Sequence, residues 1–449
     1  MRKALISLTL VLAMLPFIGC NKASLSETFY LGGIQVNEPD NRNWAKTLKS
    51  NGMNTVSVTV YARQGEWDTD AISFDSPQEN TGIISEIRAA KAEDLKVVLI
   101  LRIALDHAVE RNAFLWHGSI MPSSDQQLES WFEKYGKFVQ EWAAIAEAEG
   151  IDVLGIGSEL NQLTSTKPIS QLPQLEDYYL NEQTQEQRIQ DLLRNQGQIS
   201  TEQPKSWGDR RFNNLESLLR SQLTAQQVWA RTVSWQEFPA PIAQINQRRH
   251  LLEYHWRRLI RQIRMNYRGQ ITYAANFDQY QQVGFWDSMD FIGINAYFPL
   301  RSELASDNGQ ESLETILNSS WLNILNNIEA FRQAEFIDDK PVIFTELGYA
   351  RWENSTIEPW AYTGFSLVNS DNQNQETVVV WPEQSLNLQE RAIAFKSLHN
   401  TLEQHHPDLL NGLLYWKLST QPEQTKIEPY VLILDDTDPL QKILIQFAK

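Results

Sequence analysis

Short apolar runs that alternate with amphipathic segments constrain this chain more than any other feature of its sequence. The runs have the length and the β-branched composition of buried strands, and most are followed by apolar residues at helical spacing. Because buried parallel strands read as continuous apolar runs, the pattern predicts an α/β fold, a (β/α)8 TIM barrel. The eight expected strands are 31–36, 55–61, 96–102, 153–157, 271–276, 291–297, 342–345 and 412–416.

The competing α/β fold is a doubly wound open sheet. The glycine-rich phosphate loop that marks many such sheets follows none of the expected strands, which favours the barrel. The expected barrel domain covers 29–420. A long, mostly helical insertion of about 165–240 interrupts it after the fourth strand, as a lid, a subsite wall or a surface appendage. Residues 421–449 are expected to form a C-terminal extension packed on the barrel.

The first residues of the chain read as a targeting segment. Arg2 and Lys3 precede an apolar stretch that ends at Cys20, which is the pattern of a bacterial lipoprotein signal peptide over 1–19. Cys20 is then the lipidation site, 20–28 a tether, and the location the cell envelope, on the outer face or in the periplasm, anchored to a bacterial membrane. A plain cleaved signal, or an unmodified buried cysteine, are the alternatives. As Cys20 is the one cysteine, an intrachain disulfide is excluded.

The net charge of the chain indicates which kinds of molecule it can bind. The chain has 56 acidic against 39 basic residues, a net charge of −17, which disfavours nucleic acid and suits a neutral substrate. Its 15 tryptophans offer flat apolar faces that fit sugar rings, although most are expected to lie in the core. The sequence implies no metal and no organic cofactor, and we expect a monomer.

Two of the expected strands run directly into a glutamate, Glu159 after the fourth strand and Glu346 after the seventh. At the carboxyl ends of barrel strands they would meet across one opening, where catalytic groups lie in such folds. A pair of carboxyl groups is what hydrolysis of a glycosidic bond requires. The alternative is that each is a structural acid at a strand end. Arg102, which ends the third strand, could pair with a cleft carboxylate or form a structural salt bridge.

As a set, several motifs resemble glycoside hydrolase family 113, which contains β-mannanases and belongs to a clan of retaining barrel glycosidases. The resemblance covers most of 30–160 and 250–420. The motifs are Gly157-Ser-Glu-Leu160, Tyr273-Ala-Ala-Asn276, Phe285-Trp286, Asp290-Phe-Ile-Gly-Ile-Asn-Ala-Tyr-Phe-Pro299, Phe344-Thr-Glu-Leu-Gly-Tyr349 and Leu414-Tyr-Trp-Lys417.

The resemblance implies a role for each matched residue. Glu159 would be the acid/base and Glu346 the nucleophile. Tyr297 would hydrogen-bond the nucleophile, and Trp416 would lie under the sugar. Asn276 and Trp116 would line the cleft. Each of these last four residues could instead have a purely structural role, in core packing, in a turn or as the anchor of a loop.

One position departs from the wider clan, which usually has asparagine before the acid/base. Ser158 stands there in this chain. An asparagine at that position commonly contacts the sugar 2-hydroxyl. With the shorter serine, that contact would be lost, made by another residue or mediated by water.

The expected function is that of a retaining glycoside hydrolase that cleaves β-1,4-mannan or manno-oligosaccharides, with its two carboxyl groups about 5–5.5 Å apart. The alternatives are a non-catalytic glycan-binding surface lipoprotein and a retaining glycosidase for a different β-glycan. The segments 165–240 and 351–385, which would set specificity, match no known pattern. Endo or exo action is left open.

Overall fold

The structure is a computed structural model. The expected signal peptide, Cys20, the tether and most of the insertion 165–240 lie outside the residues it describes. It describes residues 29–76, 80–106, 116–168, 182–183, 186–187, 189–190, 220, 242–301, 312–357, 359–360, 366–369, 377–380 and 385–448.

Eight parallel strands form a closed barrel, as the sequence predicts. Each strand pairs with the next along the chain, and the last pairs with the first, so the barrel has no open edge. The expected strand positions are confirmed, with ends that differ by a few residues. The barrel strands are β1 (Tyr30–Gln35), β2 (Thr55–Gln64), β4 (Lys96–Leu105), β5 (Val153–Ser158), β6 (Gln270–Asn276), β7 (Ile292–Asn295), β8 (Val342–Leu347) and β11 (Leu410–Ser419).

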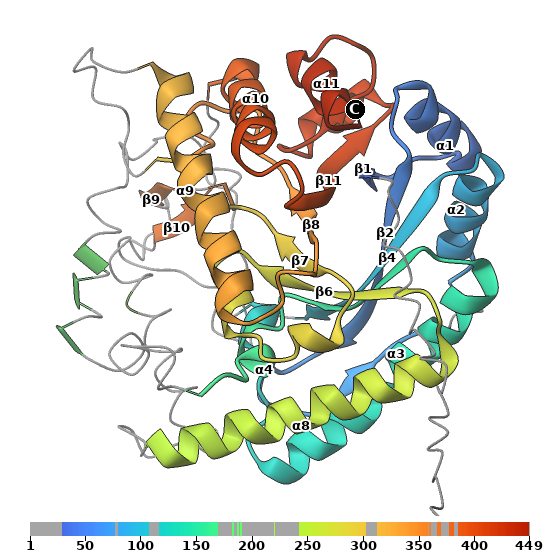
Figure 1. Cartoon of the computed structure of the whole chain (residues 1–449), viewed down its shortest axis with the longest axis vertical. Coiled ribbons are helices and arrows are strands. Elements are labelled where there is room, and N and C mark those ends of the chain that lie inside the picture. The colour runs from blue at the N-terminus through green and yellow to red at the C-terminus, as the bar shows by residue number, and fades with distance from the viewer. Residues whose placement is uncertain are drawn as a thin grey trace, which may run out of the picture.

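Helices surround this barrel (Figure 1). Polar side chains accept hydrogen bonds from the first free backbone N–H groups of several helices and so determine where these begin, as Ser124 does for α3. Gly150 ends the same helix in a left-handed conformation, φ 64°, which glycine adopts without strain. The long helices are α1 (Asn41–Ser50), α2 (Thr81–Ala92), α3 (Asp125–Glu149), α8 (Ile242–Asn266), α9 (Leu313–Ala334) and α10 (Leu388–His405).

Two apolar layers hold the barrel together. The larger lies between strands and helices, and the smaller fills the barrel axis. The strands approach so closely at Gly32 that a Cβ there would lie 1.6 Å from the Thr55 carbonyl oxygen, so only glycine fits. The axis is filled by Tyr30, Val98, Ile100, Val153, Ala274, Phe291, Ile343 and Leu414.

The C-terminal residues pack on the last barrel strand and its neighbouring helix. The short strand β12 (Leu432–Ile433) runs parallel to β11, and α11 (Pro439–Leu444) contacts α10. Arg391 of α10 is fully buried and pairs with Asp438, while it also donates to the Val431 carbonyl. Because a buried cation needs a partner, this contact ties 421–448 to the barrel.

Two further pieces of sheet were not expected from the sequence. Strand β3 (Ile72–Ser73) pairs antiparallel with the end of β2, and the segment 351–385 contains a hairpin of β9 (Ser366–Asn369) and β10 (Thr377–Val380). The composition of 351–385, rich in Trp, Pro and Asn, indicates a loop. The β-branched strand Thr377–Val380 forms nonetheless, because it pairs with β9.

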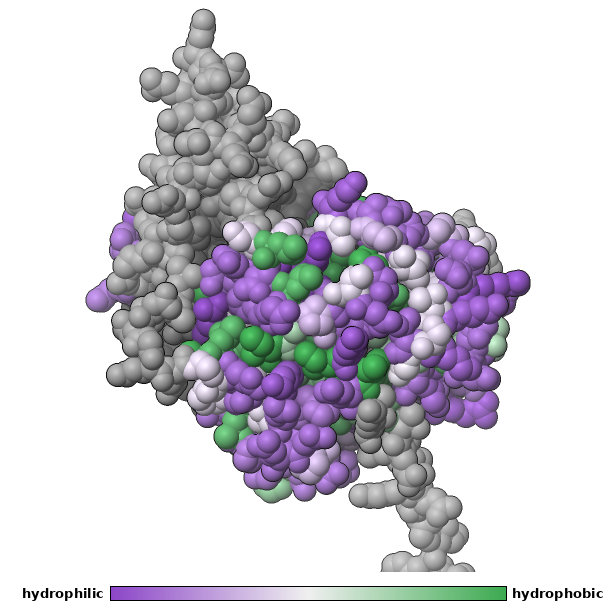
Figure 2. Space-filling model, turned by 90° about the horizontal axis from the view of Figure 1, so that it is seen from above, coloured by the Kyte–Doolittle hydropathy of each residue, from purple (hydrophilic) through white to green (hydrophobic). Residues whose placement is uncertain are grey.

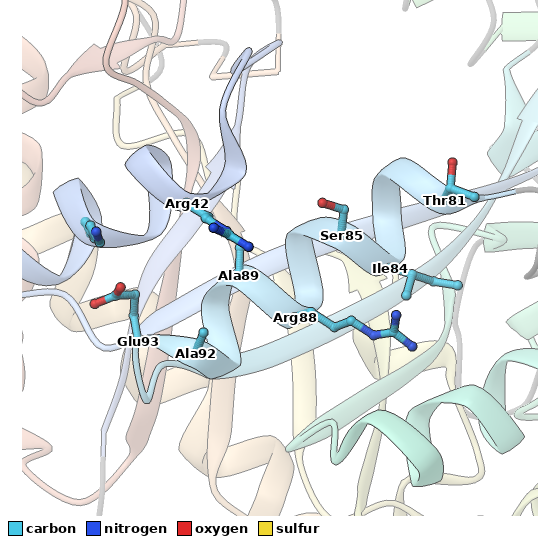
Figure 3. A pocket seen from close by; sticks show the side chains of 9 residues that line it. Arg42, Thr81, Ile84, Ser85, Arg88, Ala89, Ala92 and Glu93 are labelled. Atoms are coloured by element: carbon cyan, nitrogen blue, oxygen red, sulfur yellow. The ribbon is translucent and has the colours of Figure 1, made fainter.

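The described surface is mainly hydrophilic in the view of Figure 2, with hydrophobic residues gathered in smaller patches. Among the helices of the described residues, none combines the length and apolar character needed to cross a bilayer. An open groove lies between α1 and α2, where Arg42, Ser85 and Arg88 face it (Figure 3). Its lining comes from the helical layer, so it is separate from the strand ends that carry the expected glutamates.

A buried acid on α2 gives a prediction about pH. Glu86 is buried beside Gln35, and burial raises the pKa of its carboxyl from 4.5 to about 7, with the charge of Glu38 adding to the effect. Between these two pKa values the folded state binds more protons than the unfolded state, so stability falls as pH rises from about 4.5 to 7.

Glu86→Gln keeps an oxygen that accepts the Gln35 hydrogen bond and removes the titration. We expect the variant to match wild type at pH 4.5 and to exceed it at pH 8 by about 1–3 kcal/mol in the free energy of unfolding, measured with urea. Equal stability of the two proteins at both pH values would contradict this.

Candidate active site

The two glutamates singled out from the sequence both lie at the carboxyl end of the barrel. Glu159 directly follows β5, and Glu346 is near the end of β8; each is 8% exposed. The Glu159 backbone has φ 52°, a left-handed conformation that costs a non-glycine residue about 1 kcal/mol. The sharp change of direction after β5 therefore carries a strained residue, as functional sites often do.

Arg102 of β4 joins the groups of this site. Its guanidinium contacts Glu346 Oε1, and the same Nη2 donates to Ser158 Oγ at 2.9 Å. The Arg102 and Glu346 side chains are both nearly buried, so each requires the opposite charge of the other. Of the two alternatives left open by the sequence, Arg102 makes the pairing with a cleft carboxylate.

The second oxygen of Glu346 is held by Tyr297. The hydroxyl of Tyr297, just after β7, donates to Glu346 Oε2 at 2.9 Å. Burial raises the pKa of Tyr297 well above its ordinary value, and the charge of Glu346 acts in the same direction. The phenol therefore stays protonated and remains a hydrogen-bond donor to the carboxylate.

A polar network below the carboxylates connects four strands, β4, β5, β7 and β8. Ser158 Oγ accepts from Arg102 and from Asn295 Nδ2, the latter at 3.3 Å. The Thr345 hydroxyl donates to Asn295 Oδ1 at 2.8 Å, which orients the amide nitrogen toward Ser158. Ser158 is thus engaged with protein groups beneath the cleft. Asn295 was not selected from the sequence, although a polar residue in an otherwise apolar strand was a signal that could have found it.

Glu159 has a histidine partner that the sequence analysis missed. His117 Nε2 lies 3.0 Å from Glu159 Oε2, and Asn295 also hydrogen-bonds the Glu159 side chain. His117 begins a short 3-10 helix, His117–Ser119, in the connection between β4 and α3. No sequence pattern links this loop histidine to Glu159, because the two residues are far apart in the sequence and meet only in the folded barrel.

The two glutamates have different pKa values because their surroundings differ. A pair of carboxyl groups needs such a difference for one to act as an acid while the other is ionised. Burial raises the pKa of Glu346 to about 7; the charge of Glu159 adds to this, while Arg102 opposes it. Burial acts in the same way on Glu159, but His117, Arg102 and Asn295 outweigh it and lower that pKa to about 2. In this arrangement, negative charge lies on Glu159, next to His117.

Three aromatic residues line the approach to the carboxyl groups. Trp416 of β11 is partly exposed, and its ring centre lies 5.5 Å from the Arg102 guanidinium carbon. Trp116 is 40% exposed and contacts His117, with ring centres 4.8 Å apart. Tyr61, missed in the sequence, is 46% exposed on β2; it faces the barrel axis, because its neighbours in the strand pack in the outer core. Flat exposed rings around buried carboxyl groups fit a sugar substrate.

Asn276, the remaining expected cleft residue, has a local partner. Its Oδ1 accepts the backbone N–H of Phe277 at 2.9 Å, which fits the turn role. Within the described part of the chain, no cluster of three or more His, Cys, Asp or Glu residues has the geometry of a metal site.

A protein family matches most of the chain. The model of Glycoside Hydrolase Family 113 matches residues 34–168 and 242–380, more than half of the chain and both glutamates. The unmatched residues between these ranges lie in the expected insertion. No protein of curated function matches the chain.

Two solved structures share the fold over most of the chain. The β-mannanase AaManA from Alicyclobacillus acidocaldarius, in complex with ManMIm, is 15% identical; the match covers 94% of this chain and 98% of that one, with a TM-score of 0.57. A GH113 β-1,4-mannanase in a complex is 17% identical over 94% of this chain and 99% of that one, with a TM-score of 0.56. At these identities the likeness establishes the fold.

Replacing Arg102 by Met should destabilise the protein in a pH-dependent way. Above pH 7, Glu346 would be a buried charge without its cation, and we expect a loss of about 3–5 kcal/mol in the free energy of unfolding at pH 8. At pH 5 a protonated Glu346 makes the loss smaller. The exposed Arg88–Glu149 pair is the control, and Arg88→Met should cost less than about 1 kcal/mol at either pH. A loss of the same size at both pH values would contradict a buried charge on Glu346.

Proposed function

The chain belongs to Glycoside Hydrolase Family 113, and from this premise we propose that it cleaves β-1,4-mannan or manno-oligosaccharides by double displacement, with retention of configuration. The single observation that carries the proposal is the network in which two buried glutamates, from the ends of β5 and β8, share Arg102 as neighbour. Both of these similar structures are β-mannanases, which supports mannan as the substrate class.

Glu346 is the nucleophile of this proposal. Its two oxygens are oriented by Arg102 and by the Tyr297 hydroxyl, so one can face the anomeric carbon of a bound sugar. Attack forms the bond between that carbon and the Glu346 oxygen while the bond to the leaving oxygen breaks. Glu346 loses its negative charge when this bond forms. The Tyr297 hydroxyl and the Arg102 guanidinium stay in place and stabilise the carboxylate again when the intermediate is hydrolysed.

Glu159 is the acid and then the base. It protonates the leaving oxygen in the first step and takes a proton from water in the second. Each step inverts the anomeric carbon, so the configuration is retained over the two steps. Double displacement predicts that the two carboxyl groups lie about 5–5.5 Å apart when a sugar is bound. The exposed rings of Trp416, Tyr61 and Trp116 give apolar faces to a neutral sugar chain, in keeping with the acidic character of the protein.

Reducing-sugar release from a panel of soluble β-glycans tests the proposal. We expect wild type to release sugar from a mannan, and Glu346→Gln and Glu159→Gln to lose at least about 10²–10⁴-fold of that activity with the fold retained. Glu93→Gln, at the end of α2 on the outer layer, is the matched control and should keep full activity.

The other outcomes assign the rival functions. Release from another glycan alone would keep the mechanism and overturn the mannan assignment. If wild type and Glu346→Gln bind a glycan equally and neither releases reducing sugar, the protein is a glycan-binding protein and not an enzyme. Inverted rather than retained configuration in the first product, followed by NMR, would overturn double displacement.

We further propose that Cys20 carries a lipid that tethers a monomeric catalytic domain to a bacterial membrane. The support is the basic start, apolar stretch and cysteine of the sequence, which lie outside the described residues. In a bacterial host given labelled palmitate, the full chain should incorporate label and sediment with membranes, and Cys20→Ser should do neither. Label retained in Cys20→Ser would contradict this assignment.

A further inference from the structure

The contact between His117 and Glu159 joins a partly accessible titratable group to a buried one. The His117 side chain is 23% exposed and the Glu159 side chain 11%. Their facing atoms are 3.0 Å apart, close enough for one proton to lie on either. Imidazole changes charge in the pH range where most proteins work, whereas a free carboxyl is already ionised there.

The position of this proton decides the states of both glutamates. With the proton on His117, Glu159 is a carboxylate; with the proton on Glu159, the histidine is neutral and the glutamate is an acid. The two states contain the same number of protons. The charge of Glu159 is among the causes that raise the pKa of Glu346, so moving the proton to Glu159 also favours ionisation of Glu346. Transfer of the proton from His117 to Glu159 therefore gives an acid at Glu159 and lowers the pKa of Glu346, which then releases its own proton to water more readily and becomes a carboxylate.

We propose that His117 is a positioning residue that stores and supplies the proton with which Glu159 acts as general acid. This inference rests on the proposed function and deepens it. A bound sugar chain excludes water from the site, and loss of water disfavours the charged pair relative to the neutral one. Substrate binding therefore drives the proton from His117 Nε2 to Glu159 Oε2.

The proton balance closes over the two steps. In the first, Glu159 gives its proton to the leaving oxygen as the bond from the anomeric carbon to Glu346 forms. In the second, Glu159 takes a proton from water as the water oxygen bonds that carbon and Glu346 is released. This proton returns to the His117–Glu159 pair, so no other donor is required.

Other charged groups face the pair from the surrounding strands. Arg102 of β4 favours ionised Glu159, whereas Glu346 of β8 carries a competing negative charge. Asp278, in the turn after β6, has a pKa raised by desolvation and then by the charge of Glu159. Of the titratable groups named here, His117 makes the direct hydrogen bond to the Glu159 side chain.

Two substitutions separate proton supply from mere orientation. His117→Gln keeps an N–H that can donate to Glu159 but cannot carry the proton, and His117→Ala removes both. With oligosaccharides, whose leaving group needs protonation, we expect kcat/KM to fall at least about 10-fold in His117→Gln and further in His117→Ala. With an activated aryl glycoside, which leaves without protonation, the rate of the first step should stay within about twofold.

The pH profile gives a second readout. A carboxyl alone loses its proton at lower pH than an imidazole–carboxyl pair, so the alkaline limb of kcat/KM should move down by about one pH unit or more in His117→Gln. His405→Gln, on the outer helix α10, is the control and should leave the profile unchanged. Full oligosaccharide activity in His117→Gln, or an equal loss on both substrates, would overturn proton supply.

A measurement that needs no activity distinguishes failure of this inference from failure of the proposed function. The chemical shifts of the His117 imidazole, followed by NMR over a range of pH, should depend on pH differently in Glu159→Gln and in wild type, because the neighbouring carboxylate is gone. An unchanged titration would show that the two groups are not coupled, whatever the substrate. A changed titration in a protein inactive on every glycan would instead overturn the proposed function.

Discussion

The active site depends on the contacts of a buried arginine in β4. Arg102 contacts Glu346 and Ser158, and its charge also acts on Glu159. A guanidinium inside a protein is stable only when carboxylates and hydrogen-bond acceptors surround it, and buried carboxylates require a cation in return. The cation therefore explains how two glutamates can occupy one apolar opening, and why the Ser158, Asn295 and Thr345 side chains form a network beneath them.

The barrel supplies the rigidity that this electrostatic arrangement needs. Its strands close without an edge, and the axis is packed with side chains up to the layer where Arg102 begins. The polar groups of the site lie within or just after the barrel strands β4, β5, β7 and β8, so their positions are set by backbone hydrogen bonds rather than by a loop. The exception is His117, which lies in a connection and is more accessible than the glutamate it contacts. A group that must exchange protons with water is well placed there.

Much of the fold could be predicted because buried strands leave a local signal. Val342–Leu347 is apolar up to its glutamate, and the same pattern located every barrel strand to within a few residues. Glu159, Glu346 and Arg102 were found because they interrupt such runs at the carboxyl end. Tyr61 ends the expected second strand, 55–61, but was not selected, since alternation assigns a face and does not say whether a ring on that face stays exposed. The pairing of β9 with β10 was missed for a related reason, because it depends on a partner strand.

The order of strands and helices, the barrel and the two carboxyl groups could be read from the sequence, since each is encoded in residues that are neighbours along the chain. Which partner each carboxyl group meets depends on the folded barrel. His117 and Glu159 are 42 positions apart, and Arg102 and Glu346 are 244 apart. Contacts at such separations arise when the barrel closes, and no local periodicity records them. The acidity of each glutamate is therefore a property of the folded barrel, because it depends on burial and on charges brought from other strands.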